Sequence, residues 1–424
     1  MDLLIRRGRL AWEPERTADL LIKEGKVAAL GDGLEASGVP ELDAEGLVLA
    51  PGLVDMHVHL RQPGFEYKET IETGCAAAAR GGVTTLACMP NTSPVIDTPE
   101  LVEFVRQQAS LACGVRVLPL AAVSKGQKGQ ELTDAAALAQ AGVVALSDDG
   151  VPIQSAHLMR QALLRAEGLP ILSHCEDAEM VCNYAVNEGE VSRRLGLPGR
   201  PAVAEEIMVM RDAMLAQETG GRVHICHVST GRSVEIVRQF KKWGVAITCE
   251  TCPQYFTLTE EEVLRQGTMA RVNPPLRTPQ DVEAIIAGLQ DGTIDAIVTD
   301  HAPHSAEEKA RPLAQAPSGM VGLETSLAVA LTGLYHTGRM TLPALLEKMT
   351  VNPARILGLP QGCLEPGADG DVVLFDPEEE WVVDPAQFAS KGRNTPFAGR
   401  RLKGRVRFTI VAGRIIYRAE EKER

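Results

Sequence analysis

The middle of the chain alternates short apolar runs with longer stretches of helical periodicity. Eight such runs, rich in Val, Ile and Leu, are each followed by a helical pattern. They are residues 52–57, 83–88, 115–120, 143–146, 170–173, 223–226, 245–249 and 294–298. Strands that are apolar along their whole length are typical of a parallel sheet with both faces covered. Eight strand–helix units predict an α/β fold, a (β/α)8 TIM-type barrel.

The two ends of the chain have a different, β-rich pattern. Residues 3–5 and 20–22 are short apolar runs separated by Gly and charged residues, and residues 405–411 alternate apolar and polar side chains. We therefore expect a small β-sandwich domain built from both termini. It would comprise residues 1–51 and 358–424, with the barrel in residues 52–357.

Composition and charge limit the function classes. The 424 residues are 45% hydrophobic and 23% charged, as in ordinary globular proteins. No apolar run is long enough for a membrane helix, and the first residues do not resemble a signal peptide. The net charge of −13 disfavours nucleic acid as a partner but permits a small anionic substrate. Nine Cys without regular spacing indicate reduced thiols and a cytoplasmic protein.

Metal-ligand residue types follow five of the eight predicted strands. Active sites of such barrels lie at the carboxyl ends of the strands, so these residues should meet at one rim. They are His57 and His59 after the first run, Asp148 and Asp149 after the fourth, His174 after the fifth, His227 after the sixth and Asp300 after the eighth.

His57 and His59 are two residues apart on a strand, so both side chains point to the same side. Imidazole with carboxylate suits zinc, with manganese, iron or cobalt as substitutes. Two pairs of histidines and a shared carboxylate predict a two-metal site with a bridging hydroxide as nucleophile. The spacing does not decide whether Asp148 or Asp149 bridges the metals, and His224 is interpreted as structural.

Further candidates for substrate chemistry occur at the same rim. Asp300 is placed to act as general base. Arg61 and Asn91 are placed to hold a carboxylate or an amide, and Arg offers a bidentate fork for a carboxylate. Asn273 and His304 are additional candidates for substrate contact.

Several motifs of the chain resemble those of the dihydroorotases, in the amidohydrolase superfamily. Residues 55–64, DMHVHLRQPG, resemble the first family signature. Residues 299–304, TDHAPH, with Lys309 five positions on, resemble the second. Residues 89–92, 147–150, 174–176, 226–230 and 272–277 follow in the family's order, so the resemblance covers essentially the whole chain.

The resemblance implies the reversible interconversion of L-dihydroorotate and N-carbamoyl-L-aspartate in pyrimidine synthesis, with two Zn²⁺ per subunit. It implies that one zinc is held by His57, His59 and Asp300, the other by His174 and His227, and that Asp149 bridges them. Asp300 would also shuttle the proton. The implied substrate contacts are His59, Arg61, Asn91, Asn273, His304, Ser318 and Gly319.

Relatives of the dihydroorotases provide the alternatives. Asp149 stands where many of these relatives carry a bridging carboxylated Lys, which matches long-chain bacterial dihydroorotases and disfavours hydantoinases and allantoinases. However, residues 250–255, in the loop after the seventh predicted strand, are closer to the sequence that hydantoinases and allantoinases have in this loop. Ser318 stands where the family tends to have a Phe. A non-catalytic partner of aspartate transcarbamoylase is disfavoured because all six ligand positions are filled. The resemblance also implies a homodimer and is compatible with association with aspartate transcarbamoylase.

Overall fold

A barrel of parallel strands forms the centre of the computed structural model, which describes residues 1–182 and 184–420. Its strands are β6 (Leu53–Val58), β7 (Val83–Cys88), β8 (Arg116–Pro119), β9 (Leu146–Ser147), β10 (Ile171–Ser173), β13 (Val223–Ile225), β14 (Ile247–Thr251) and β15 (Ala296–Ile297). They pair in the orders β6-β7-β8 and β9-β10-β13-β14-β15. Parallel bridges join Ala121 to Leu146 and Val58 to His301, which closes the ring. The predicted (β/α)8 barrel is confirmed.

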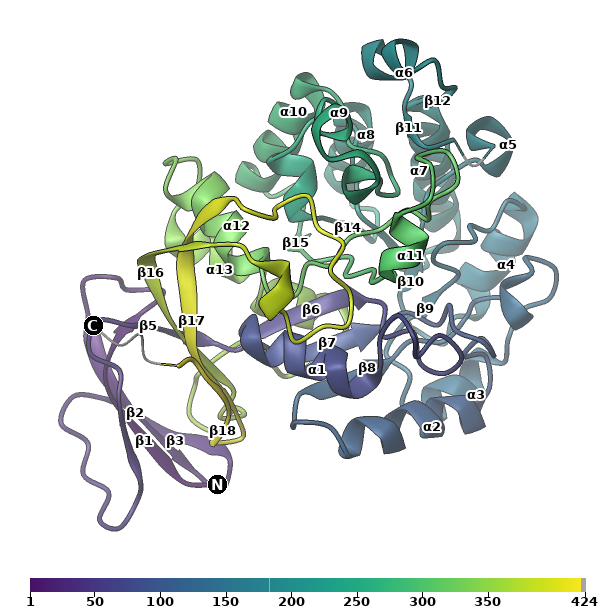
Figure 1. The fold of residues 1–424 in the computed structure, drawn as a ribbon. Helices are drawn as coiled ribbons and strands as arrows, with labels where there is room; N and C mark the ends of the chain where they lie inside the picture. The colour runs from purple at the N-terminus through teal and green to yellow at the C-terminus, as the bar shows by residue number, and fades with distance from the viewer. Residues whose placement is uncertain (183, 421–424) are drawn as a thin grey trace.

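Helices surround the strands (Figure 1). Those that follow barrel strands are α1 (Ile71–Arg80), α2 (Pro99–Ser110), α3 (Ala135–Gln140), α4 (Ala156–Arg165), α7 (Val203–Thr219), α8 (Gly231–Lys242) and α10 (Pro279–Gln290). The side chains of Thr70, Ser155, Thr230 and Thr278 accept backbone N–H bonds at the starts of α1, α4, α8 and α10. These caps explain why the helices begin there. The chain then passes through α12 (Ser326–Ala330), η4 (Leu331–Tyr335), α13 (Leu342–Glu347) and α14 (Val351–Ile356).

Short insertions extend several loops at the carboxyl ends of the strands. η1 (Lys125–Gln127) follows β8. The loop after β10 carries α5 (Ala178–Val181), β11 (Val186–Asn187), α6 (Glu190–Leu195) and β12 (Gly199–Arg200). The loop after β14 carries η2 (Pro253–Phe256), α9 (Glu262–Gln266) and η3 (Gly267–Ala270), and α11 (Ala306–Lys309) follows β15.

Both termini contribute to one further sheet, as predicted. Its eight strands are β1 (Leu3–Leu10), β2 (Thr17–Lys23), β3 (Lys26–Gly31), β4 (Glu41–Asp43), β5 (Val48–Pro51), β16 (Val372–Val382), β17 (Arg401–Val411) and β18 (Arg414–Arg418). Antiparallel pairing of β5 with β16 joins the N-terminal strands to the C-terminal strands. Buried side chains from both ends, including Ile5, Leu20, Val372 and Ile410, form a separate apolar core. The domain bounds remain a prediction, with the β domain in residues 1–51 and 358–424 and the barrel in residues 52–357.

The connection between β16 and β17 leaves the terminal sheet and extends over the barrel (Figure 1). It contains η5 (Pro385–Gln387). The Oδ1 atom of Asn394 accepts a hydrogen bond from the backbone N–H of His304 at 3.1 Å, and the hydroxyl of Ser390 donates to Glu69. This connection therefore braces the rim at which the predicted site lies.

None of the helices among the described residues has the length and apolar character needed to cross a membrane.

Candidate metal centre

The six predicted metal ligands are buried and converge at the carboxyl ends of the barrel strands. The Asp149 carboxylate lies at the centre. Its Oδ1 atom is 3.5 Å from His57 Nε2, 3.3 Å from His174 Nδ1 and 3.5 Å from His227 Nε2. Its Oδ2 atom is 3.5 Å from His59 Nε2.

Asp300 faces the same centre from the end of the last strand. Its Oδ1 atom is 3.1 Å from His59 Nε2 and 3.6 Å from His57 Nε2. His57, His59 and Asp300 form one group able to hold a metal, and His57, Asp149 and His227 form another. Side chains that are far apart in the sequence therefore present nitrogen and oxygen atoms to one small volume.

Two atoms at this centre indicate that a metal fits. His57 Nε2 and Asp149 Oδ1 are buried but have no hydrogen-bond partner among the described residues. Buried polar atoms are rarely left unpaired, and imidazole nitrogen with carboxylate oxygen is a donor set for zinc-like cations. Burial raises the pKa of Asp149, but the surrounding imidazoles of His57, His174 and His227 outweigh burial and hold it well below its ordinary value. The centre thus favours an anionic carboxylate.

The structure separates the roles of the adjacent aspartates. Asp148 turns away from the histidines and accepts hydrogen bonds from the backbone N–H groups of Val123 and Ser124 at 2.8 and 3.1 Å, and from the Ser124 hydroxyl. Asp149 alone of the two points into the cluster of imidazoles. Asp148 therefore holds the loop, a choice that residue spacing had left open.

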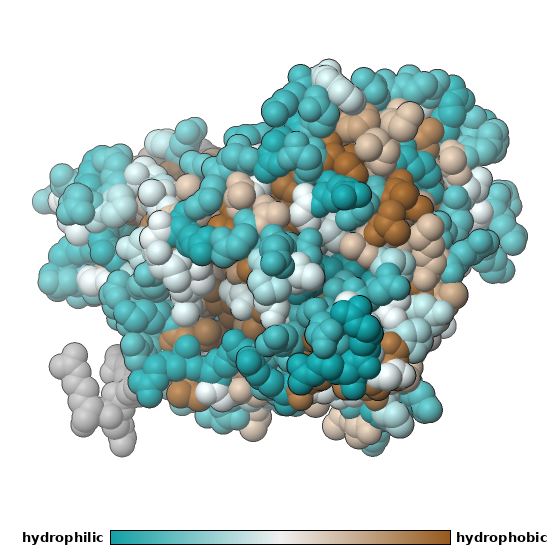
Figure 2. All heavy atoms as spheres, turned by 90° about the horizontal axis from the view of Figure 1, so that it is seen from above, coloured by the Kyte–Doolittle hydropathy of each residue, from teal (hydrophilic) through white to brown (hydrophobic). Residues whose placement is uncertain are grey.

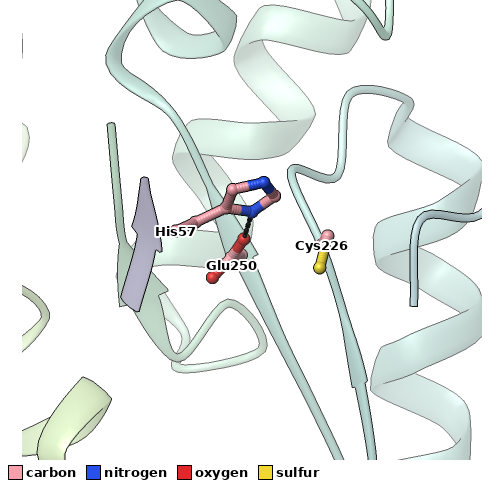
Figure 3. Close-up of side chains that lie close together, drawn as sticks. All are labelled: His57, Cys226 and Glu250. Atoms are coloured by element: carbon pink, nitrogen blue, oxygen red, sulfur yellow. Dashed lines mark hydrogen bonds and ion pairs between the residues drawn. The ribbon is translucent and has the colours of Figure 1, made fainter. Parts of the chain in front are cut away.

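Figure 3 shows a third group of possible ligands, which consists of His57, Cys226 and Glu250. Glu250 Oε1 lies 2.5 Å from His57 Nδ1, and Glu250 Oε2 lies 3.1 Å from His224 Nε2. Burial raises the pKa of Cys226 well above its ordinary value. Glu250 therefore accepts the Nδ1 proton of His57 and leaves Nε2 free to face the centre.

The same arrangement recurs at two other histidines. His59 Nδ1 lies 2.9 Å from Asn91 Oδ1, so Nδ1–H donates to the amide oxygen and Nε2 faces Asp300. His174 Nε2 lies 3.5 Å from Glu176 Oε2, which leaves Nδ1 toward Asp149. A partner of this kind on the outer ring nitrogen orients an imidazole whose other nitrogen binds a metal.

Asn273 is part of a polar network beside His174. Its Oδ1 atom accepts from Arg200, whose guanidinium also donates to Glu176 Oε1 at 2.8 Å. Its Nδ2 atom donates to Glu176 Oε2 at 3.3 Å. Arg200 and Glu176 thus orient the amide of Asn273 at the edge of the centre.

Three residues of the centre have left-handed backbone conformations. The φ angles are 62° at Arg61, 34° at His227 and 47° at Asp300. Such conformations are strained for residues other than Gly and are maintained only where the surroundings enforce them. At Gly319, where φ is +136°, a Cβ atom would lie 2.8 Å from the Ala302 side chain, so this wall of the site requires Gly.

A cavity of about 220 Å³ is lined by five of the six predicted ligands, all except His57. All seven predicted substrate-contact residues line it: His59, Arg61, Asn91, Asn273, His304, Ser318 and Gly319. His304 donates from Nε2 to the Ser318 carbonyl at 2.9 Å, and burial with nearby Arg61, Lys68 and Lys309 lowers its pKa to about 2. His304 is therefore neutral. The roles of these residues remain predictions.

Three supporting residues were not among the predicted site residues. Glu250 directly follows a predicted strand, and Glu176 lies two positions after His174. A charged residue inside a buried strand would have been a usable signal for Glu250. Arg200 lies in the insertion after β10, far in sequence from Asn273, and no local pattern points to it. His224, interpreted as structural, supports the site indirectly because it contacts Glu250.

The barrel and its histidine–carboxylate centre define the class as a metal-dependent cyclic amidohydrolase. The structure of an L-hydantoinase (dihydropyrimidinase) from Arthrobacter aurescens is similar, with a TM-score of 0.88 and 27% identity over 99% of this chain and 97% of that chain. A dihydropyrimidinase from Brevibacillus agri shares the fold, with a TM-score of 0.85, 23% identity and coverage of 99% of this chain and 95% of that chain.

Sequence comparison identifies the family. Residues 46–233 match the family described as dihydro-orotase-like. A dihydroorotase from Pelotomaculum thermopropionicum is 52% identical over 94% of this chain and 93% of its own length. Another, from Syntrophus aciditrophicus, is 48% identical over 99% of this chain and 100% of its own length. The chain belongs to the dihydroorotase family.

Proposed function

We propose that this chain is a dihydroorotase, which interconverts L-dihydroorotate and N-carbamoyl-L-aspartate in pyrimidine synthesis. The observation that carries the substrate assignment is the guanidinium of Arg61. It lines the cavity, and its side-chain hydrogen bond among the described residues runs to the Pro303 carbonyl, at 3.3 Å, rather than to a carboxylate. Dihydroorotate supplies a carboxylate for this cation, whereas hydantoin and allantoin have none.

The donor set supports two zinc ions per subunit. His57, His59 and Asp300 would hold one ion, His174 and His227 the other, and Asp149 would contact both. When bound, the metals polarise the ring amide carbonyl and lower the pKa of the attacking water to about 7.

Asp300 is the proposed general base. Its carboxylate lines the cavity and lies 3.1 Å from His59 Nε2. It takes a proton from the attacking water as oxygen adds to the amide carbon, and delivers that proton to the ring nitrogen as the C–N bond breaks. In the reverse direction the same carboxyl group donates a proton to the departing oxygen.

The remaining cavity residues are proposed to hold the substrate. Arg61 would bind the carboxylate as a bidentate fork, and Asn91 and Asn273 would bind amide groups. Neutral His304 and the backbone at Ser318 and Gly319 would form the opposite wall. A site built to pair polar substrate groups rejects analogues that lack them, because its own groups are then left unpaired.

The chain is also proposed to act as a homodimer in the cytoplasm. The outer face of α7 exposes Val203, Ile207, Met210 and Met214, with exposed fractions of 38–57%. Figure 2 shows a largely hydrophilic surface on which hydrophobic side chains occur in patches. Exposed apolar faces of this kind are typical of protein interfaces.

All nine cysteines are free thiols, as expected in a reducing compartment. Light scattering would test the dimer, and mixing with aspartate transcarbamoylase would test whether the chain also associates with that enzyme.

Steady-state assays with dihydroorotate, hydantoin and allantoin, combined with elemental analysis of the purified protein, test the proposed function. We expect dihydroorotate to be the preferred substrate and zinc to be present at two ions per chain. Removal of metal by a chelator should abolish turnover, and added zinc should restore it. Turnover of only hydantoin or allantoin would refute the substrate assignment, whereas turnover unaffected by a chelator would refute the metal assignment.

A further inference from the structure

Lys309 is an unusual core residue. Its side chain is among the largest fully buried ones in the described residues, with 2% of the residue exposed. It ends α11, in the loop that follows the last barrel strand. A buried ammonium is costly unless its charge is compensated. Its position behind two segments that line the cavity suggests why the chain retains it.

The partners of the ammonium are carbonyl oxygens. Lys309 Nζ donates to Pro317 O and Gly319 O, both at 3.0 Å, and to Arg271 O at 3.3 Å. An ammonium has three N–H donors, and here three acceptors match them. The two segments that it joins, around residues 271–273 and 317–319, both contribute lining residues to the cavity.

Other contacts fix the same wall. Gly319 N donates to Arg271 O at 2.9 Å, and Asn394 Nδ2 donates to Gly319 O at 3.0 Å. The Thr268 hydroxyl donates to the carbonyl of Lys309 itself at 2.6 Å. Lys309 thus joins the loop after β14 to the loop after β15, and the Gly319 carbonyl that it contacts also accepts from Asn394 in the connection between β16 and β17.

Burial and the nearby Arg271 lower the pKa of Lys309 to about 7, against an opposing effect of Glu308. Replacement of buried ionic groups by apolar side chains of similar volume is often neutral or stabilising. An amine is therefore an unusual choice here on grounds of fold stability alone.

We propose that Lys309 is a positioning residue for substrate binding: it holds Ser318 and Gly319 against the segment that carries Asn273, and so shapes the cavity wall opposite the metal ligands. The inference rests on the proposed function, because it assumes that this cavity binds the substrate. Lys309 is not a catalytic residue, since its Nζ atom is directed at backbone carbonyls and it is absent from the cavity lining.

The test compares Lys309→Met with Lys348→Met in the zinc-loaded full-length enzyme. Lys348 is a matched control, because it is also a buried lysine, 7% exposed, whose Nζ donates to a backbone carbonyl, that of Ile294, at 2.7 Å. Ile294 precedes β15, at the end of the barrel away from the metal ligands. We expect Lys309→Met to raise KM for dihydroorotate about tenfold or more, with kcat changed less than about threefold and metal content unchanged. Lys348→Met should leave KM unchanged.

Two further measurements keep the inference testable. Hydrogen exchange of peptides covering residues 313–321 should accelerate in Lys309→Met but not in Lys348→Met, and this readout does not depend on the substrate. Lys309→Gln retains two donors and should raise KM less. Equal KM values in Lys309→Met and wild type, unchanged exchange, or failure of both Lys309 variants to fold would overturn the proposal. An inactive wild type with accelerated exchange in Lys309→Met would instead refute the proposed function. It would still support the inference that Lys309 holds residues 317–319 in place.

Discussion

Replacement of Glu250 by Gln tests whether the carboxylate behind His57 prepares the metal centre. Glu250 is fully buried and contacts His57 Nδ1 at 2.5 Å and His224 Nε2 at 3.1 Å. Gln preserves the size of the side chain but has only one amide oxygen, so one imidazole N–H would face an NH₂ group instead of an acceptor. The substitution also removes the negative charge of Glu250, which favours the Nδ1–H tautomer of His57.

The expected magnitude follows from these contacts. Loss of a carboxylate that orients a metal-bound histidine typically weakens metal affinity by about 10- to 100-fold. This corresponds to about 1.4–2.7 kcal/mol. Glu250→Gln should therefore lose zinc at chelator concentrations that leave the wild type loaded, and excess zinc should restore a large part of its kcat.

Competition with a chromophoric chelator measures this affinity directly. Glu262→Gln is the matched control, because Glu262 is also buried, at 4% exposed, but pairs with Arg265 and Arg400 outside the cavity lining. Zinc affinity of Glu250→Gln within about twofold of the wild type, in a folded protein, would contradict the proposed role of Glu250. An equal loss in Glu262→Gln would show that the effect is not specific to the centre.

Three further predictions concern the base, the substrate cation and a titrating carboxyl group. Asp300→Ala should abolish turnover, with partial loss of metal; near-normal kcat would exclude Asp300 as the base. Arg61→Met should raise KM for dihydroorotate about 10- to 100-fold because a charge-assisted pair is lost, and an unchanged KM would remove Arg61 from the substrate site. Burial raises the pKa of Glu324 from 4.5 to about 7, despite the opposing effects of Arg80 and two backbone N–H groups. The folded state therefore keeps a proton that the unfolded state has lost between these values, and stability falls by about 3 kcal/mol as pH rises through this window. In urea unfolding, Glu324→Gln should gain stability relative to wild type at pH 8 compared with pH 4.5; a difference independent of pH would contradict this pKa shift.

Much of the barrel and the ligand set could be predicted from the sequence. Parallel strands place their carboxyl ends at one rim, so His57, His174, His227 and Asp300 could be assigned to one site once the strands were recognised. The apolar run at residues 83–88 predicted a strand, and the structure places β7 at Val83–Cys88. These features depend on local patterning, which a sequence records directly.

The tertiary structure decided what depends on contacts between distant segments. His57 and Glu250 are 193 positions apart, and Lys309 contacts carbonyls of two loops, so no spacing reveals either contact. The choice between Asp148 and Asp149 also required the fold. Both are buried and adjacent, and only the positions of Ser124 and of the imidazoles show which carboxylate faces the histidine cluster. The sequence alone determined which side chains reach the rim, because these residues directly follow strands that local patterning identifies. The packing of the loops around them determined what each side chain does there.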